Sequence, residues 1–379
     1  MIPSTTRRAA LAILGLALAP LAACAPTSSA HGLTVVATTT QICDYVTQIA
    51  AASTDLSLDK TDASGKSSHV GVAPDNAALT MSLTCLLAPN ASAHEHEMTP
   101  AQSAALADAD VMAVSGVDLE HFLDDAVASS GFHGRMVVTS GVLTASDVDN
   151  PGAADPQTPY TIDRGIERVE VSPWPFPPEN AGEAPEFRFD PHVWTSPKRA
   201  RVQVENLGAG LAAAAPDAAA SINAATASYL EDLDALDAWA TASIETVPEG
   251  QRVLFTSHDA FGYFSGDYGI RFIGAALTDF NDQQDATADH IASAVQAVKD
   301  SGAVALFAEN SNNSKSIEAI ARGAGVTPIV GDDALYGDSL GPDGSAGATY
   351  VGSIIHNVRA VTDAWGGTAP ALPERLAGQ

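Results

Sequence analysis

Short apolar runs typical of buried strands alternate with helical stretches along most of the chain. Residues 33–37 read as a strand and the residues from Ile42 onward as a helix, and this alternation continues to about residue 145. It restarts near residue 252 and ends in a last helix at about 350–365. Because parallel strands need crossover helices, the pattern predicts an α/β fold. We expect two similar lobes, each a mostly parallel sheet flanked by helices.

A long helical tract separates the two alternating regions. It runs from Pro197 to about Ile244. Its later part places five apolar side chains near one stripe: Ile222, Tyr229, Leu233, Leu236 and Trp239. A helix of about 27 residues is roughly 40 Å long, which is more than one lobe needs. We therefore expect a rigid linking helix over 216–246 between an N-terminal lobe (33–215) and a C-terminal lobe (247–379), with a ligand cleft between the lobes.

Two segments lack this regular pattern. Residues 53–77 are rich in Ser, Asp, Lys and Gly and show no sustained periodicity, which predicts an exposed loop. Residues 146–189 contain eight prolines and nine carboxylates, a composition that disfavours packed core elements. The second segment is therefore predicted to be a long surface loop within the N-terminal lobe.

The first 24 residues have the pattern of an export signal. Arg7-Arg8 precedes an apolar run at 9–18, and "LAAC" ends at Cys24. This ending resembles a lipobox, which implies cleavage before Cys24 and a lipid on its sulfur. The alternative is an ordinary secretory signal in which the cysteine is incidental. Either interpretation predicts an exported protein, with residues 25–32 as a tether and, for the lipobox, an anchor on the outer face of the cytoplasmic membrane.

Charge and cysteine content restrict the possible functions and the state of the cysteines. The 18 basic and 46 acidic residues give a net charge of −28, which argues against nucleic-acid binding because phosphate contacts need a basic face. Such a surface raises the local concentration of cations, although acidity also serves solubility. With Cys24 assigned to lipid, Cys43 and Cys85 remain, and they are either a disulfide in an oxidising compartment or two buried thiols.

Three of the ten histidines fall at junctions between predicted elements. His94 follows the strand within 78–89, His192 lies on a strand-to-helix turn before Ser196-Pro197, and His258 ends the first strand of the second region. Side chains at the carboxyl ends of strands from two lobes can converge on the cleft between them. Asp338 follows a later strand and turn in the same way. Three imidazole nitrogens and one carboxylate suit Zn²⁺, with Mn²⁺ an alternative if the carboxylate binds through both oxygens.

The sequence around these residues resembles that of a known family. "HEHEMTP" (94–100) is similar to a family segment H-x-x-E-P-T-P, "DPHVWTSP" (190–197) to N-P-H-V-W-L-D-P, and "SHDAFGYFSGDYGI" (257–270) and "YGDSLG" (336–341) fit two later segments. The family is that of zinc- and manganese-binding solute-binding lipoproteins of metal-uptake ABC transporters. Many zinc-binding relatives carry a histidine-rich loop, whereas residues 146–189 contain no histidine.

The resemblance implies a function and a site. It implies an exported lipoprotein, here expected to be a monomer, that binds Zn²⁺ as cargo through His94, His192, His258 and Asp338 and delivers it to a permease and its ATPase. A histidine rather than a glutamate at position 258 favours zinc over manganese. Glu309, at the end of a strand, is either a hydrogen-bond partner of a ligand imidazole or an exposed carboxylate.

Other functions are less consistent with the sequence. "HEHE" does not match the H-E-x-x-H pattern of metalloproteases, and the adjacent side chains of Ser257, His258 and Asp259 point in different directions. We therefore expect no enzymatic activity. A manganese-specific protein of the same type and an adhesive surface lipoprotein on this fold remain as alternatives.

Overall fold

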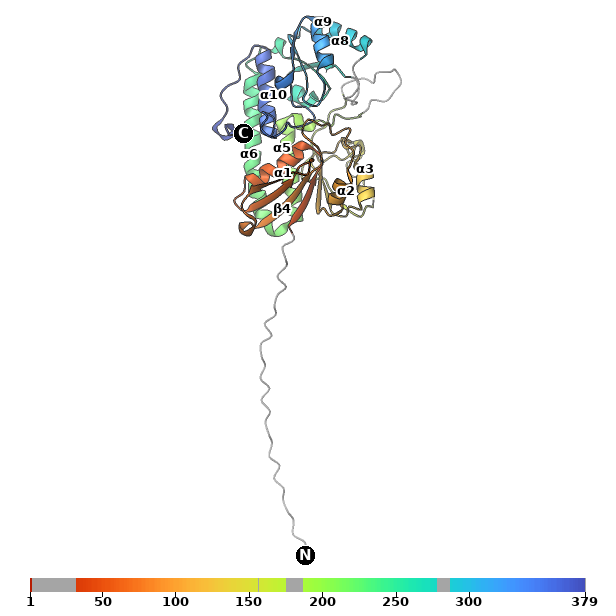
Figure 1. Cartoon of the computed structure of the whole chain (residues 1–379), viewed down its shortest axis with the longest axis vertical. Coiled ribbons are helices and arrows are strands. Elements are labelled where there is room, and N and C mark those ends of the chain that lie inside the picture. The colour runs from red at the N-terminus through yellow and green to blue at the C-terminus, as the bar shows by residue number, and fades with distance from the viewer. Residues whose placement is uncertain (2–31, 156, 175–186, 278–286, 379) are drawn as a thin grey trace. The chain divides into compact units, whose positions relative to one another are not determined.

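The computed structural model describes Met1 and residues 32–155, 157–174, 187–277 and 287–378. Gly32–Gln379 form one compact unit, and the description below concerns that unit (Figure 1). Apart from Met1, the predicted signal peptide lies outside the described residues, and so does Cys24. No helix among the described residues is long and apolar enough to cross a membrane.

The N-terminal lobe is built on a sheet of seven strands within the described residues. Its order is β3-β2-β4-β1-β5-β6-β7, and every neighbouring pair is parallel except β2 and β3. The strands are β1 (Leu33–Ala37), β2 (Leu56–Thr61), β3 (Ser67–Gly71), β4 (Leu79–Cys85), β5 (Val111–Val114), β6 (Arg135–Val138) and β7 (Thr161–Asp163). The helices that follow these strands are α1 (Thr40–Ala51), α2 (Pro100–Ala107), α3 (Leu123–Ser130) and α4 (Ala145–Asp149).

The C-terminal lobe has a smaller, parallel sheet of four described strands in the order β11-β10-β8-β9. They are β8 (Val253–Thr256), β9 (Arg271–Ala275), β10 (Ala305–Phe307) and β11 (Thr327–Ile329). Its helices are α7 (Gly262–Asp267), α8 (Ala288–Ser301), α9 (Lys315–Ala324) and α10 (Tyr350–Ala364). The expected pair of α/β lobes is thus confirmed, although the lobes differ in the number of their strands.

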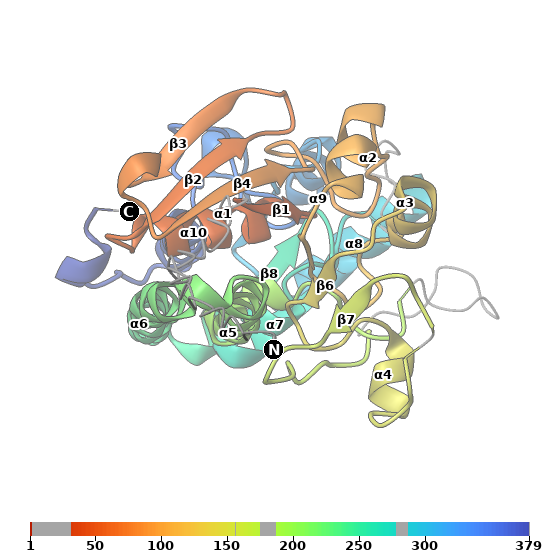
Figure 2. The ribbon, with the colours of Figure 1, turned by 90° about the horizontal axis from the view of Figure 1, so that it is seen from below.

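Two long helices lie side by side along the molecule (Figure 2). They are α5 (Pro197–Ala214) and α6 (Ala219–Ile244), and α6 packs against α1 of the N-terminal lobe and against α10 of the C-terminal lobe. The five apolar side chains of the predicted stripe are all buried. Each fully buried Leu of this kind contributes about 1.5–3 kcal/mol. The prediction of a long helix joining the lobes is confirmed.

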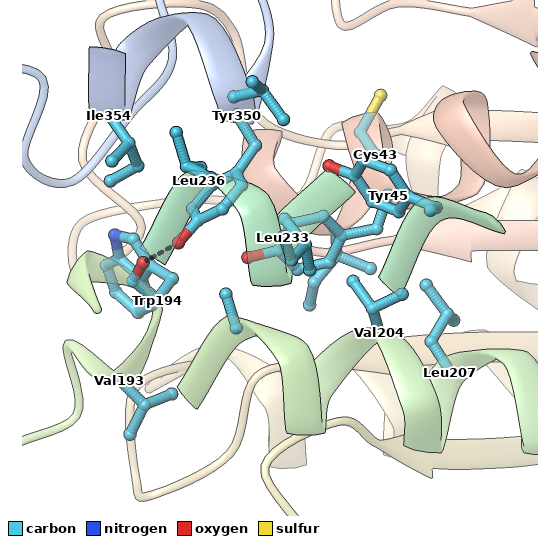
Figure 3. Packing of buried hydrophobic residues seen from close by; sticks show 14 of the residues in the cluster. Cys43, Tyr45, Val193, Trp194, Val204, Leu207, Leu233, Leu236, Tyr350 and Ile354 are labelled. Carbon is cyan, nitrogen blue, oxygen red and sulfur yellow. Dashed lines mark hydrogen bonds between the residues drawn. The ribbon is translucent and has the colours of Figure 1, made fainter. Parts of the chain in front are cut away.

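The core is continuous from α1 through α6 to α10 (Figure 3). The ring of Tyr45 on α1 lies edge-on to that of Tyr350, with their centroids 5.2 Å apart. The Tyr350 hydroxyl donates a hydrogen bond to the carbonyl oxygen of Trp194, at 2.7 Å. Packing between the lobes therefore includes both apolar contacts and satisfied polar groups.

Residues 53–77 are not an exposed loop, so that prediction was wrong. They form the antiparallel hairpin β2–β3, and β2 pairs in parallel with β4. Leu56 and Leu58 are fully buried and pack in the core of the N-terminal lobe. The alternation of apolar and polar residues that defines β2 covers only three residues, which is too short to stand out among so many polar neighbours.

Residues 146–189 also contain regular structure, which corrects the prediction of a plain surface loop. Within the described part, β7 extends the sheet beside β6, and Val169 and Phe187 are buried. Arg164 binds the carboxylate of Asp147 through two nitrogens, each at 3.0 Å. Ion pairs within the segment thus offset the repulsion between its carboxylates, which were one reason to predict a loop.

Cys43 on α1 and Cys85 at the end of β4 form a disulfide, with their Cα atoms 5.6 Å apart. The bond ties the first turns of α1 to the strand that leads toward His94. Of the two alternatives left open by the sequence, the structure contains the bonded pair.

Candidate metal centre

Each of the four candidate ligands follows a strand or a turn that the local sequence specifies. His94 lies between β4 and α2, whose first turn is closed by a capping box of Thr99 and Gln102. His258 comes two residues after the end of β8, and Asp338 lies in the segment between β11 and α10.

His192 precedes a short 3₁₀ turn (Val193–Thr195) that leads into α5. Ser196 occupies the cap position of α5, but its hydroxyl donates to Asp267 instead of accepting from the helix.

The structure brings these four side chains together. One donor atom from each of them lies within 4.8 Å of the others. His94 Nε2 is 3.1 Å from His192 Nε2 and 3.6 Å from Asp338 Oδ2. Asp338 Oδ1 is 3.5 Å from His192 Nε2 and 3.7 Å from His258 Nδ1. Two ligand candidates come from each lobe, so the cluster lies where the lobes meet.

All four residues are buried, and His94 is the most exposed of them at 7%. Burial lowers the pKa of His192 to about 3 and lowers that of His94 well below its usual value. Both rings are therefore neutral near pH 7, which is the form that coordinates a metal. Burial also acts to lower the pKa of His258, but the carboxylates of Asp338 and Glu309 outweigh it and hold that pKa well above its usual value.

His192 is oriented by Asp190, a residue whose role the sequence did not reveal. Asp190 Oδ1 accepts hydrogen bonds from the backbone N–H of His192 at 2.9 Å and from its Nδ1 at 2.8 Å. This leaves Nε2 directed at the other candidate ligands. Burial raises the pKa of Asp190 to about 7. A carboxylate two residues before a candidate ligand was the signal that could have identified it.

Space around Asp190 is restricted by α7 of the other lobe. A Cβ atom on Gly262 would lie 2.4 Å from Asp190 Oδ2, so this position has room only for glycine. The hydroxyl of Tyr263 donates to the backbone oxygen of Asp190 at 2.8 Å. The C-terminal lobe therefore fixes the turn that carries His192.

Asp338 is held in turn by the N-terminal lobe. Ser92 Oγ donates to Asp338 Oδ2 at 2.7 Å, and Gln41 Nε2 donates to the Asp338 backbone oxygen at 3.0 Å. The backbone N–H of Leu340 donates to Thr40 Oγ1 at 2.9 Å. No feature of the sequence pointed to Ser92 or Gln41, because these contacts exist only once the lobes are docked.

Glu309 lies beside His258, as one of the two interpretations of the sequence expected. Its Oε1 accepts from the His258 backbone N–H at 2.9 Å, and its Oε2 lies 3.5 Å from His258 Nδ1. The carboxyl is buried, so it is not the exposed strand-end carboxylate of the alternative. Glu309 is thus placed to interact with the imidazole of a candidate ligand.

The remaining described histidines lie outside the cluster, and most make local contacts. His69 is paired with Asp59 across the hairpin, and His290 and His356 interact with the backbone oxygens of Ala275 and Ala334. His121 differs from these, since its ring lies 6.5 Å from that of His94.

A long helix joining two α/β lobes, with a buried cluster of metal-ligand side chains between them, defines a substrate-binding protein of the cation-capturing class. The chain belongs to the family of zinc-uptake complex component A, periplasmic (ZnuA), whose family model matches residues 72–364. It is therefore a metal-binding component of ABC-type metal uptake, and the expectation that it is not an enzyme is confirmed.

Relatives within this group are named for different metals. The manganese-binding lipoprotein MntA of Bacillus subtilis (strain 168) is 29% identical over 285 residues, which cover 74% of this chain and 82% of that protein. The zinc-binding protein TroA of Treponema pallidum (strain Nichols) is 33% identical over 184 residues, 47% of this chain and 58% of that protein. The iron ABC transporter substrate-binding lipoprotein MtsA of Streptococcus pyogenes serotype M1 is 24% identical over 270 residues, 71% and 77% of the two chains.

Solved structures support the fold. The periplasmic zinc binding protein TroA from Treponema pallidum superposes with a TM-score of 0.64 at 23% identity, covering 88% of this chain and 99% of that one. A manganese-bound mutant of the periplasmic metal binding protein from Candidatus Liberibacter asiaticus gives 0.62 at 17% identity, covering 87% and 98%. At these low sequence identities, both superpositions show a shared fold and nothing more.

Proposed function

We propose that this protein captures one Zn²⁺ ion as cargo through His94, His192, His258 and Asp338. The observation that carries the proposal is the convergence of four donor atoms, two from each lobe, within 4.8 Å. Burying three imidazoles and a carboxylate is costly unless they are paired, and a divalent cation among them satisfies all four at once.

The spacing of the donors supports zinc. A tetrahedral Zn²⁺ site with bonds of about 2.05 Å has ligand atoms about 3.3 Å apart. The separation of His94 from His192 and those of Asp338 from the three histidines run from 3.1 to 3.7 Å and so bracket this value. Three nitrogens and one oxygen are also a donor set that zinc favours.

Manganese is the second candidate, and one observation favours it. Both oxygens of Asp338 face the cluster, Oδ2 toward His94 and Oδ1 toward His192. If both bind the cation, the coordination number rises to five, which suits the harder Mn²⁺ ion. The names of the relatives do not decide between these metals.

The proposed function also requires export, anchoring at the membrane and delivery of the cation. We propose that residues 1–24 direct export, that Cys24 carries a lipid anchor on the outer face of the cytoplasmic membrane, and that residues 25–32 form a tether. From there a monomer delivers its cation to the permease and ATPase of an ABC importer. The acidic composition of the chain supports capture of cations over binding of nucleic acid.

Competition calorimetry on the stripped chain lacking residues 1–24 tests the cargo. We expect one tight Zn²⁺ site and weaker binding of Mn²⁺. Tighter binding of Mn²⁺ would make manganese the cargo. The absence of tight binding of either ion would favour the alternative of an adhesive surface lipoprotein.

A further inference from the structure

The candidate metal centre is buried, so an incoming cation must pass other side chains before it reaches the ligands. No ligand candidate is more than 7% exposed. As a whole residue His94 is the least buried of the three histidines, at 7% against at most 2%, but its imidazole is only 1% exposed. A side chain that lies between solvent and one of these imidazoles can therefore decide how the cation arrives.

His121 occupies this position. It is exposed, and its ring centroid lies 6.5 Å from that of His94. The ring stacks on Phe187, with centroids 5.3 Å apart and planes inclined by 24°. Phe187 in turn lies 5.5 Å from His94. An aromatic contact thus holds an exposed imidazole at the edge of the buried cluster.

The backbone that carries His121 adopts an unfavourable conformation. Gly116, Val117 and Asp118 all have positive φ, at 87°, 57° and 58°. A left-handed conformation costs a β-branched residue such as Val117 on the order of 1–2 kcal/mol. Strain of this kind persists only where surrounding contacts impose it, and it is often found at functional sites.

Hydrogen bonds to the neighbouring loop impose this conformation. The N–H groups of Val117 and Asp118 donate to the backbone oxygens of Val142 and Leu143 at 2.8 and 3.0 Å. The Glu120 carboxylate accepts from the N–H groups of Ser115 and Gly116, at 2.6 and 3.0 Å. These hydrogen bonds fix the backbone of residues 115–120. They therefore also fix the position of His121, which follows directly.

A cavity of about 360 Å³ lies beside His121. Asp118 and Asp124 line it together with His121, and all three are exposed. Carboxylates on the wall of a cavity raise the local concentration of cations. Hydrated cations are thus expected to gather next to His121, whose ring also lies near that of His94.

We infer that His121 is a transfer ligand for the cation, a step that rests on the proposed metal-binding function. One imidazole nitrogen of His121 binds the incoming Zn²⁺ and replaces part of its water shell. The ion then passes to His94 and on to the complete set of four ligands, and His121 is left without metal. The cation leaves by the same route, so His121 lowers the barrier in both directions.

This role has a kinetic signature. A group that binds metal only on the way in and out changes the rates of association and dissociation by the same factor. The equilibrium constant then stays nearly constant. A fifth equilibrium ligand, in contrast, would change the dissociation constant.

The test is stopped-flow measurement of Zn²⁺ binding and release against a chromogenic chelator, with the chain lacking residues 1–24. His121→Phe keeps a ring on Phe187 but removes the nitrogen donors, and His121→Asn provides a second, smaller replacement. We expect both rate constants to fall by about tenfold, within the range that local electrostatic focusing and capture supply. The ratio of the rate constants should change less than twofold. His133→Ala, at another exposed histidine, is the control and should match the wild type.

Equal rates in wild type and both His121 variants would overturn the inference, and so would a loss of affinity without a loss of association rate. Failure of the wild type to bind Zn²⁺ would instead contradict the proposed function. Equilibrium titration of the wild type is done first, which separates the two failures.

Discussion

His192 is suited to the proposed role of a metal ligand. Its ring is buried, and this burial lowers its pKa to about 3. Its Nδ1 is hydrogen-bonded to Asp190 Oδ1. Its Nε2 lies 3.1 Å from His94 Nε2 and 3.5 Å from Asp338 Oδ1. Such a neutral, oriented imidazole is suited to bind a metal without first losing a proton.

Replacing His192 is expected to abolish tight binding. His192→Ala removes one of the four proposed donors, and its effect should exceed the 10–100-fold that outer partners of ligands typically contribute. We therefore expect Zn²⁺ affinity to fall by a factor on the order of 100 or more in competition calorimetry. His290→Ala, which removes only a local contact to Ala275 on the C-terminal lobe, is the matched control. Equal losses in both variants would show that His192 is not a ligand.

Asp190 should matter almost as much as a ligand, although it does not face the cation. Asp190→Asn keeps the shape of the side chain but removes the carboxylate that fixes the His192 ring. We expect Zn²⁺ affinity to fall by about 10–100-fold without loss of folding. Asp217→Asn, an exposed position, should have no effect. Unchanged affinity in Asp190→Asn would remove this carboxylate from the site.

At the residue scale, the sequence predicted which residues are candidate ligands, but it did not predict the contacts that hold them in place. His94, His192, His258 and Asp338 could be found because each follows a predicted strand or turn. The contact of Ser92 with Asp338 spans 246 residues and that of Gln41 spans 297. Such pairs depend on the docking of two lobes, which local patterns do not encode.

At the scale of elements, the hairpin β2–β3 is the main structure that the sequence concealed. Leu58 is fully buried in it, whereas Ser68 on β3 is exposed. Leu58→Ala should therefore reduce the free energy of unfolding by about 2–5 kcal/mol, as large-to-small core substitutions do. Ser68→Ala should change it by no more than about 0.5 kcal/mol. Urea denaturation distinguishes a core strand from an exposed loop, in which both variants would be near neutral.

The segment that contains α4 and β7 is expected to respond to acid through Asp147. Burial raises the pKa of Asp147, but the hydrogen bonds and charge of Arg164, together with the backbone N–H groups of Leu143 and Thr144, outweigh this, so the pKa lies below its usual value of 3.8. A lowered pKa contributes stability above that usual value, and the contribution is lost as the pH falls through the folded-state pKa.

Asp147→Asn should therefore be less stable than the wild type at pH 6 but approach it as the pH falls well below 3.8. Urea unfolding curves at several pH values measure this difference. Asp217→Asn again serves as the control, because it should follow the wild type throughout. A constant gap between wild type and Asp147→Asn would show that the ion pair does not set the pH response.

At the scale of the whole molecule, hydrogen bonds as well as apolar contacts hold the two lobes together. The strand-helix alternation predicted both lobes, and the length of the tract before Ile244 predicted the helix that joins them. The sequence did not show how firmly they are docked. Trp194 Nε1 donates to the Gly337 backbone oxygen at 2.9 Å, and the Tyr350 N–H donates to the buried carboxylate of Asp44 at 2.7 Å.

This docking predicts how the metal is released. A rigid closure of one lobe on the other would have to bend α6 and break the hydrogen bonds of Trp194 and Tyr350. Local movement around His94 and His258 would leave them intact. We therefore expect crystal structures with and without Zn²⁺ to superpose as whole molecules, with differences confined to the segments that carry the ligands. A rotation of one lobe as a rigid body would contradict this and would make α6 a hinge.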